Sequence, residues 1–238
     1  MAINHASLGM FHHEWQDIEQ QILGSKLHEI SHKILIEPEY TASEEEEDQV
    51  NFKVALKLLD VPCRADQSKC RNIDIYLESK VSYRIISRKQ KEIIEYHTKV
   101  QYCKRDNKNL TCIMGYRYDG DATATQYGHP IFHMHFKTDV LYQFILDLEK
   151  DKFNVIKLET QERDEIRIPT AQMDVINTFV SIFADHAFSD ASSLELFQPF
   201  LEDVEPFLTS CNTKKDKLYK DGPQTDSCHS NRWYPISI

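Results

Sequence analysis

The hydrophobic and polar positions of this 238-residue chain fall into a helical block, an alternating block and a second helical block. In the first block, apolar residues recur every three or four positions from Phe11 to Ile34, which is the spacing of one helical face. We therefore predict a helix from about Met10 to Ile34, bent near Gly24. It should end before Pro38, because the residue preceding a proline disfavours helical backbone.

From residue 50 onward the apolar residues alternate with polar ones, which is the pattern of strands that bury one face. Short polar turns separate these segments, and strands joined in this way form an antiparallel meander. The predicted strands cover residues 51–59, 73–87, 94–102, 110–118 and 129–136, and a further short strand is predicted at 153–158.

Helical spacing returns in the last third of the chain. Thr170 is a suitable N-cap for a helix that runs to Ala187, and Ser192 with Glu195 forms a capping box for a second helix. Beyond residue 210 the sequence becomes polar, which favours an extended tail over 211–238.

These elements predict an α+β fold. It consists of an antiparallel β-meander sheet of five or six strands, with an N-terminal helix and a C-terminal helical segment packed on one face. We expect a single domain over residues 1–210, with the helix in 1–37, the meander in 50–160 and the later helices in 170–210.

Composition narrows the class of protein. A net charge of -10 argues against a general affinity for nucleic acid or for an anionic membrane. No stretch approaches the roughly 18 continuous apolar residues that a membrane span requires. The six cysteines include no C-x-x-C pair, which favours free thiols in the cytoplasm. Two of them, Cys103 and Cys112, fall near opposite positions on facing strands.

The sequence contains no strong catalytic motif. Phosphate-cradling glycine loops, the G-x-S-x-G nucleophile elbow and the helical H-E-x-x-H zinc pattern are all absent from it. Whether the protein is an enzyme must therefore be judged from weaker constellations, of which there are two.

The first constellation is a row of histidines in the strand predicted at 129–136. In a strand, His129, His133 and His135 point to one face, while Phe132, Met134 and Phe136 point to the other, which we interpret as the core face. Three imidazoles on one face are a candidate site for zinc or another divalent transition metal. The residues that could complete such a ligand set are His97, Asp119, Asp121 and Asp139. A hydrogen-bonded histidine network without metal explains the same pattern.

The second constellation is a concentration of positive charge. Residues 80–108 contain nine bases and three acids, a net charge of +6, so the remaining chain carries -16. A basic hairpin on an acidic body suits an acidic protein partner, whereas a nucleotide or RNA phosphate is less favoured. Lysines on a strand edge that discourage aggregation explain the same charges. The predicted partner-binding residues are Arg84, Arg88, Lys89, Lys91, Lys99, Lys104 and Arg105.

Two hypotheses follow. In the first, the chain is a non-catalytic binding or regulatory subunit of a cytosolic complex that docks an acidic protein through the basic hairpin. In the second, it is a metal-dependent hydrolase or nuclease that uses His129, His133 and His135. Under the first hypothesis the sequence predicts no resident cofactor. It predicts no oligomeric state under either hypothesis.

Overall fold

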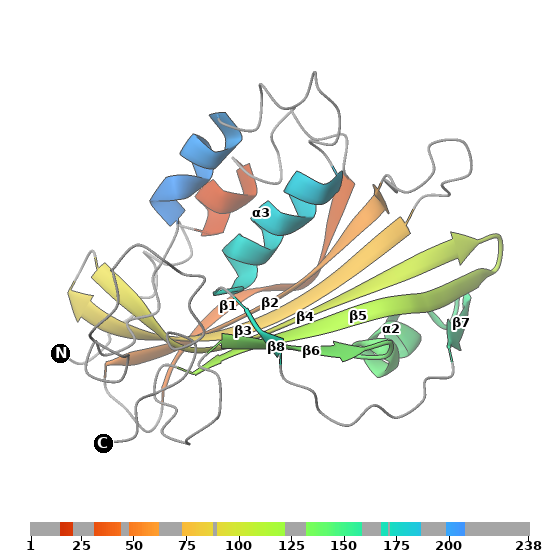
Figure 1. Cartoon of the computed structure of the whole chain (residues 1–238), viewed down its shortest axis with the longest axis horizontal. Helices are drawn as coiled ribbons and strands as arrows, with labels where there is room; N and C mark the ends of the chain where they lie inside the picture. Colours follow the sequence, from red (N-terminus) through yellow and green to blue (C-terminus); the bar gives the residue numbers. More distant parts are fainter. Residues whose placement is uncertain are drawn as a thin grey trace.

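In the part of the chain that the structure describes, eight strands form one sheet, and helical segments lie on both of its faces (Figure 1). The computed structural model describes residues 15–20, 31–43, 48–61, 73–87, 90–121, 132–158, 168–170, 172–186 and 199–207. Its strands are β1 (Ser31–Ala42), β2 (Gln49–Val61), β3 (Ile73–Ser87), β4 (Gln90–Asp106), β5 (Asn109–Asp121), β6 (Phe132–Lys137), β7 (Asn154–Lys157) and β8 (Ile168–Pro169). Its helical elements include α2 (Tyr142–Glu149), α3 (Val175–His186) and the 3-10 turn η2 (Glu205–Phe207). The predicted α+β class is confirmed.

The meander from β2 to β6 runs in sequence order and is antiparallel throughout, as predicted. The sheet as a whole is mixed, because β7 pairs in parallel with β5. Parallel neighbours require a crossover connection, and here the chain passes through α2 between β6 and β7. Among the described residues the strand order is β1-β2-β3-β4-β5-β6-β8, and β7 pairs with the first residues of β5.

The N-terminal helix was predicted to be too long. Residues 15–18 are α-helical, but residues 31–42 form β1, which pairs with β2. Pairing is irregular between Ile34 and Ile36 and again between Ile36 and Glu39. These bulges remove the clean alternation that identifies a strand, so the helical spacing continued by chance to Ile34.

The later helix also begins further along the chain than predicted. The carboxylate of Asp174, rather than the hydroxyl of Thr170, accepts hydrogen bonds from the backbone N–H groups of Ile176 and Asn177, at 2.9 and 3.3 Å. The capping box at Ser192 and the tail at 211–238 lie outside the described residues, so the domain boundary at residue 210 stays a prediction.

One face of the sheet, here called the helix face, holds the main core. Its strands contribute Phe52, Leu56, Val81 and Val100, which pack in one cluster with α3 and with the helical residues of 15–18 and 199–204. In Figure 1 these three helical segments lie together on the same side of the sheet. The N-terminal and C-terminal helical segments therefore share a face, as predicted.

The opposite face, here called the histidine face, carries Lys53, Lys80, His97, Asp119 and His133 on successive strands. At one end of it, α2 covers a second, smaller core. Within the described ranges, no helix combines the length and the apolar character that a membrane span needs.

Candidate functional site

Strand register brings the candidate residues together. On the histidine face, His97 of β4, Asp119 of β5 and His133 of β6 are direct pairing partners. Two residues along, Arg117 pairs with His135 in the same way. Because side chains two apart on a strand share a face, these residues form a compact polar group across three strands.

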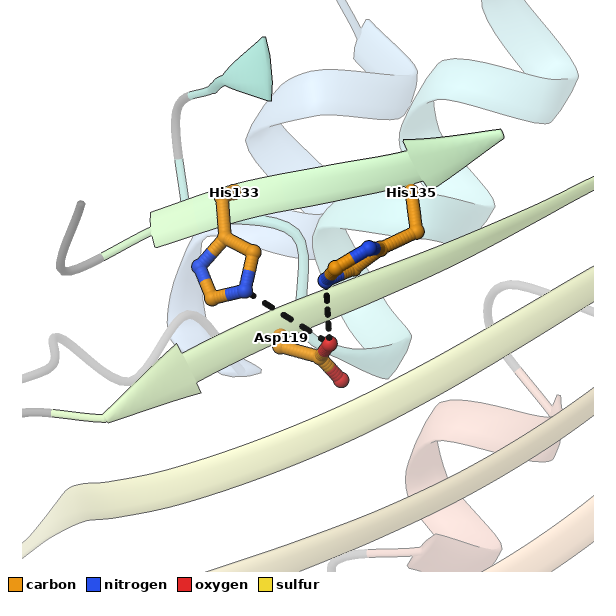
Figure 2. A group of neighbouring side chains, drawn as sticks. All are labelled: Asp119, His133 and His135. Atoms are coloured by element: carbon orange, nitrogen blue, oxygen red, sulfur yellow. Dashed lines mark ion pairs between the residues drawn. The ribbon is translucent and has the colours of Figure 1, made fainter. Parts of the chain in front are cut away.

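Asp119 lies at the centre of this group. His97 Nδ1 donates to its Oδ1 at 2.7 Å, and Arg117 Nε donates to its Oδ2 at 2.8 Å. Both imidazoles of β6 also point toward the carboxylate (Figure 2): Nε2 of His135 lies 3.3 Å from Oδ2, and Nε2 of His133 lies 3.7 Å from it. His133 and His135 are only 4% and 3% exposed, so the site is largely removed from solvent.

These contacts set the protonation states. Burial by itself would raise the pKa of the Asp119 carboxyl, but the hydrogen bonds from His97 and Arg117, and their charges, lower it below its ordinary value. The hydrogen bonds that His97 makes to Asp119 and to Glu95 raise the pKa of that imidazole to about 9. At neutral pH Asp119 is therefore an anion and His97 a cation.

The geometry of Asp119, His133 and His135 fits a metal ion. Ligand atoms from the three residues all lie within 4.8 Å of one another. A tetrahedral ion with bonds of about 2.0–2.1 Å holds its ligand atoms about 3.4 Å apart. The separations of 3.3 and 3.7 Å are close to that value. Two imidazole nitrogens with one carboxylate oxygen are a donor set that divalent transition metals accept.

The structure places the sequence-predicted ligands as follows. His133 and His135 lie together, and Asp119, one of the four residues named to complete the set, lies between them and His97. Asp139 forms an ion pair with Lys157 instead. Asp121 is the last residue of β5, and His129 lies outside the described residues. The imidazole face of β6 is also the more buried one, since Phe136 on the helix face is 54% exposed.

Most of the predicted partner-binding residues already face a group of this chain. Arg84 lies near Asp48 and Glu92, at 3.6 and 3.3 Å. The ammonium of Lys99 lies 3.1 Å from Glu78, and that of Lys91 lies 4.6 Å from the ring centroid of Tyr83. Arg105 pairs with Asp60 and Asp74, Lys104 is exposed, and Arg88 and Lys89 lie outside the described residues.

These bases are also spread along a long strand. Lys91 is near the start of β4, and Lys104 is near its end. Thirteen residues of extended chain span roughly 43 Å. The +6 charge of residues 80–108 is therefore spread along the length of the sheet rather than gathered on one surface.

A buried ionic cluster under α2 was not foreseen. The ammonium of Lys57 lies 2.9 Å from Glu149 of α2 and 3.1 Å from Asp74, and Tyr76 donates to Glu149 at 3.0 Å. The nearby thiols of Cys103 and Cys112 are register partners, 3.7 Å apart, as their sequence positions suggested. Lys57 and Glu149 are 92 residues apart in sequence, and no local pattern relates them.

Comparison with known proteins adds no identification: no family model, no curated protein and no solved structure matches the chain. Function must be argued from the site itself.

Proposed function

We propose that this protein binds one divalent transition-metal ion through Asp119, His133 and His135 and uses the ion for hydrolysis. The observation that carries the proposal is the convergence of two imidazole nitrogens and one carboxylate oxygen on a buried point of the sheet. Of the three histidines expected from sequence, His133 and His135 belong to this ligand set and His129 lies outside the described residues, while Asp119 supplies the third ligand atom.

The surroundings of the site support this role. His97 donates to one oxygen of Asp119 and so orients the carboxylate, as second partners of metal ligands commonly do. Arg117 donates to the other oxygen, Oδ2, which keeps a further lone pair for an ion. An anionic carboxylate is also the form that binds a metal.

The chemistry follows from the number of ligands. Three protein ligands would leave a coordination position for water, and a bound ion such as zinc would lower the pKa of that water from 15.7 to about 7. In hydrolysis the water oxygen forms a bond to the electrophilic atom of the substrate. The leaving group departs with the electron pair of the broken bond and takes up a proton, so water is the only co-reactant.

Metal analysis tests the proposal. We expect protein purified without chelators, or reconstituted with Zn²⁺, Mn²⁺, Fe²⁺ or Co²⁺ and then desalted, to retain about one ion per chain for at least one metal. The variants Asp119→Asn and His133→Ala/His135→Ala should lose it. His32→Ala serves as the matched control, because His32 lies on β1 and pairs with Glu19. Wild-type protein that retains none of these metals would leave the histidines as a purely structural network.

Docking of an acidic protein has less support. Arg84, Lys99 and Arg105 each lie beside a carboxylate of this chain, so they offer less free charge than the sequence suggests. That hypothesis remains testable by charge reversal at Arg84 and Lys91, which should abolish complex formation.

We also propose a cytoplasmic location, supported by the cysteine usage.

A further inference from the structure

A cavity opens on the histidine face next to the proposed metal site. Its volume is about 420 Å³, within the range of small-molecule sites. The residues that line it come from four strands and include Glu39, Asn51, Lys53, Lys80, Ser82 and His97. Since His97 also contacts Asp119, the cavity and the metal site share a wall.

Two lysines lie side by side in the lining of this cavity. Lys53 of β2 and Lys80 of β3 are direct register partners, and like charges directly opposite on a sheet are destabilising. Three other cations of this face lie beside carboxylates: Lys57 beside Asp74 and Glu149, Lys99 beside Glu78, and Arg117 beside Asp119.

Lys53 and Lys80 differ from those cations. In the part of the chain that the structure describes, no carboxylate lies within ion-pairing distance of either ammonium. Glu39 is the register partner of Lys53 on β1, yet it forms no ion pair with it. Glu95, which also lines the cavity, pairs with His97. The two lysines therefore bring two uncompensated positive charges to the cavity wall.

We propose that this cavity binds the terminal phosphate of a small phosphorylated molecule between Lys53 and Lys80, and that this molecule is the substrate of the metal site. The assignment of the molecule as substrate rests on the proposed function. A phosphate dianion matches two ammonium groups, whereas a carboxylate carries a single charge. Ser82 and Asn51 add neutral hydrogen-bonding groups to the same wall.

Strand spacing sets the length of the substrate. Lys80 is two strands and Lys53 three strands away from Asp119, which at about 4.8 Å per strand gives roughly 10–14 Å. The phosphate held by the lysines is therefore not the group attacked at the ion. The bond that is hydrolysed lies at the opposite end of a molecule about as long as a nucleotide.

Calorimetric titration with inorganic phosphate tests the lysine site, using wild-type protein, Lys53→Gln/Lys80→Gln and, as matched control, Lys99→Gln. Lys99 has the same charge on the same face but already pairs with Glu78. We expect the phosphate Kd to rise at least tenfold in the double variant and to stay within twofold in the control. An unchanged Kd in the double variant, or no phosphate binding by wild-type protein, would overturn the proposal. Equal affinity for malonate would overturn the assignment to phosphate.

Removing the metal distinguishes a failure of the lysine phosphate site from a failure of the proposed hydrolase function. Chelator-treated wild-type protein and the Asp119→Asn variant should bind phosphate with the wild-type Kd, because the lysines are not metal ligands. Loss of phosphate binding in both would place the anion on the ion and refute the lysine site. Wild-type protein that retains no metal even after reconstitution, yet binds phosphate at the lysines, would refute only the hydrolase. The single variant Lys80→Gln replaces the double variant if circular dichroism shows that the latter is unfolded.

Discussion

Gly120 holds a place that no other residue can fill without disturbing the site. It is the register partner of Tyr96, and a Cβ atom added to it would lie 2.1 Å from Cε1 of that ring. Tyr96 is completely buried, and its hydroxyl accepts a hydrogen bond from the backbone of Met173 at 2.8 Å. The bare backbone of Gly120 thus lets the Tyr96 ring pack closely against β5, at the residue that follows Asp119.

We predict that Gly120→Ala destabilises the protein by about 1–3 kcal/mol, the usual cost of overpacking a core. Urea denaturation followed by circular dichroism measures this free energy of unfolding. In a Tyr96→Leu background the clash is relieved, so the same alanine substitution should cost less. Equal costs in the two backgrounds would show that Tyr96 is not the obstacle.

At the scale of single residues, the sequence predicts part of the candidate metal site. The spacing of His133 and His135 reveals a shared face, because alternation in a strand is a local property. Asp119 could be named only as one of four candidates, since its position opposite His133 depends on the register between β5 and β6. The role of His97 likewise depends on the register between β4 and β5.

Among the elements, α2 is attached to the sheet by charge as well as by apolar contact. Glu149, the last residue of the helix, is 4% exposed and contacts both Lys57 and Tyr76. Burial by itself would raise the pKa of the Glu149 carboxyl, but its partnership with Lys57 lowers it. Lys57 therefore compensates two buried carboxylates, those of Glu149 and Asp74.

Lys57→Met should destabilise the protein by about 3–5 kcal/mol, because it removes the buried cation that the carboxylates of Asp74 and Glu149 share. Lys99→Met is the matched control: its ion pair is partly exposed and should contribute less than about 1 kcal/mol. Chemical denaturation gives both values. If the two variants lose similar stability, the cluster under α2 does not hold the helix in place.

The elements differ in how readily their sequences reveal them. The strands β2 to β5 alternate regularly over long stretches and were all predicted, although β4 extends four residues beyond its predicted bounds at each end. The helix α2 was missed because Leu141 at its N-cap offers no side-chain hydrogen bond, so a start signal is lacking. The parallel pairing of β7 depends on that helix and could not be predicted without it.

Considered as a whole, the molecule buries tyrosines on both faces of the sheet. Burial, reinforced by the nearby Glu149, raises the pKa of Tyr76 well above 10.0. Burial, reinforced by Tyr116, Tyr118 and Asp185, does the same for Tyr102. Each hydroxyl thus resists ionisation in the folded state more than in the unfolded chain.

The fold should therefore lose stability in alkali. For a group whose pKa is raised by folding, the stabilisation is complete below the unfolded pKa near 10 and is lost as pH rises above it, by up to about 1.4 kcal/mol per pH unit. Circular dichroism against pH, with tyrosinate absorbance in parallel, measures the midpoint. Tyr102→Phe should move it to higher pH, and an unchanged midpoint would exclude Tyr102 as a cause.

The irregular pairing of β1 has a consequence for how this protein behaves at high concentration. An edge strand exposes backbone donors and acceptors to other chains and can template aggregation. Here β1 ends the strand order, is bulged twice and contains Pro38, and the opposite end of that order is a strand of two residues, β8. A bulge or a proline prevents another strand from pairing continuously. The bulges and the proline make β1 hard to identify as a strand from sequence. They also prevent a second molecule from pairing with this edge of the open sheet.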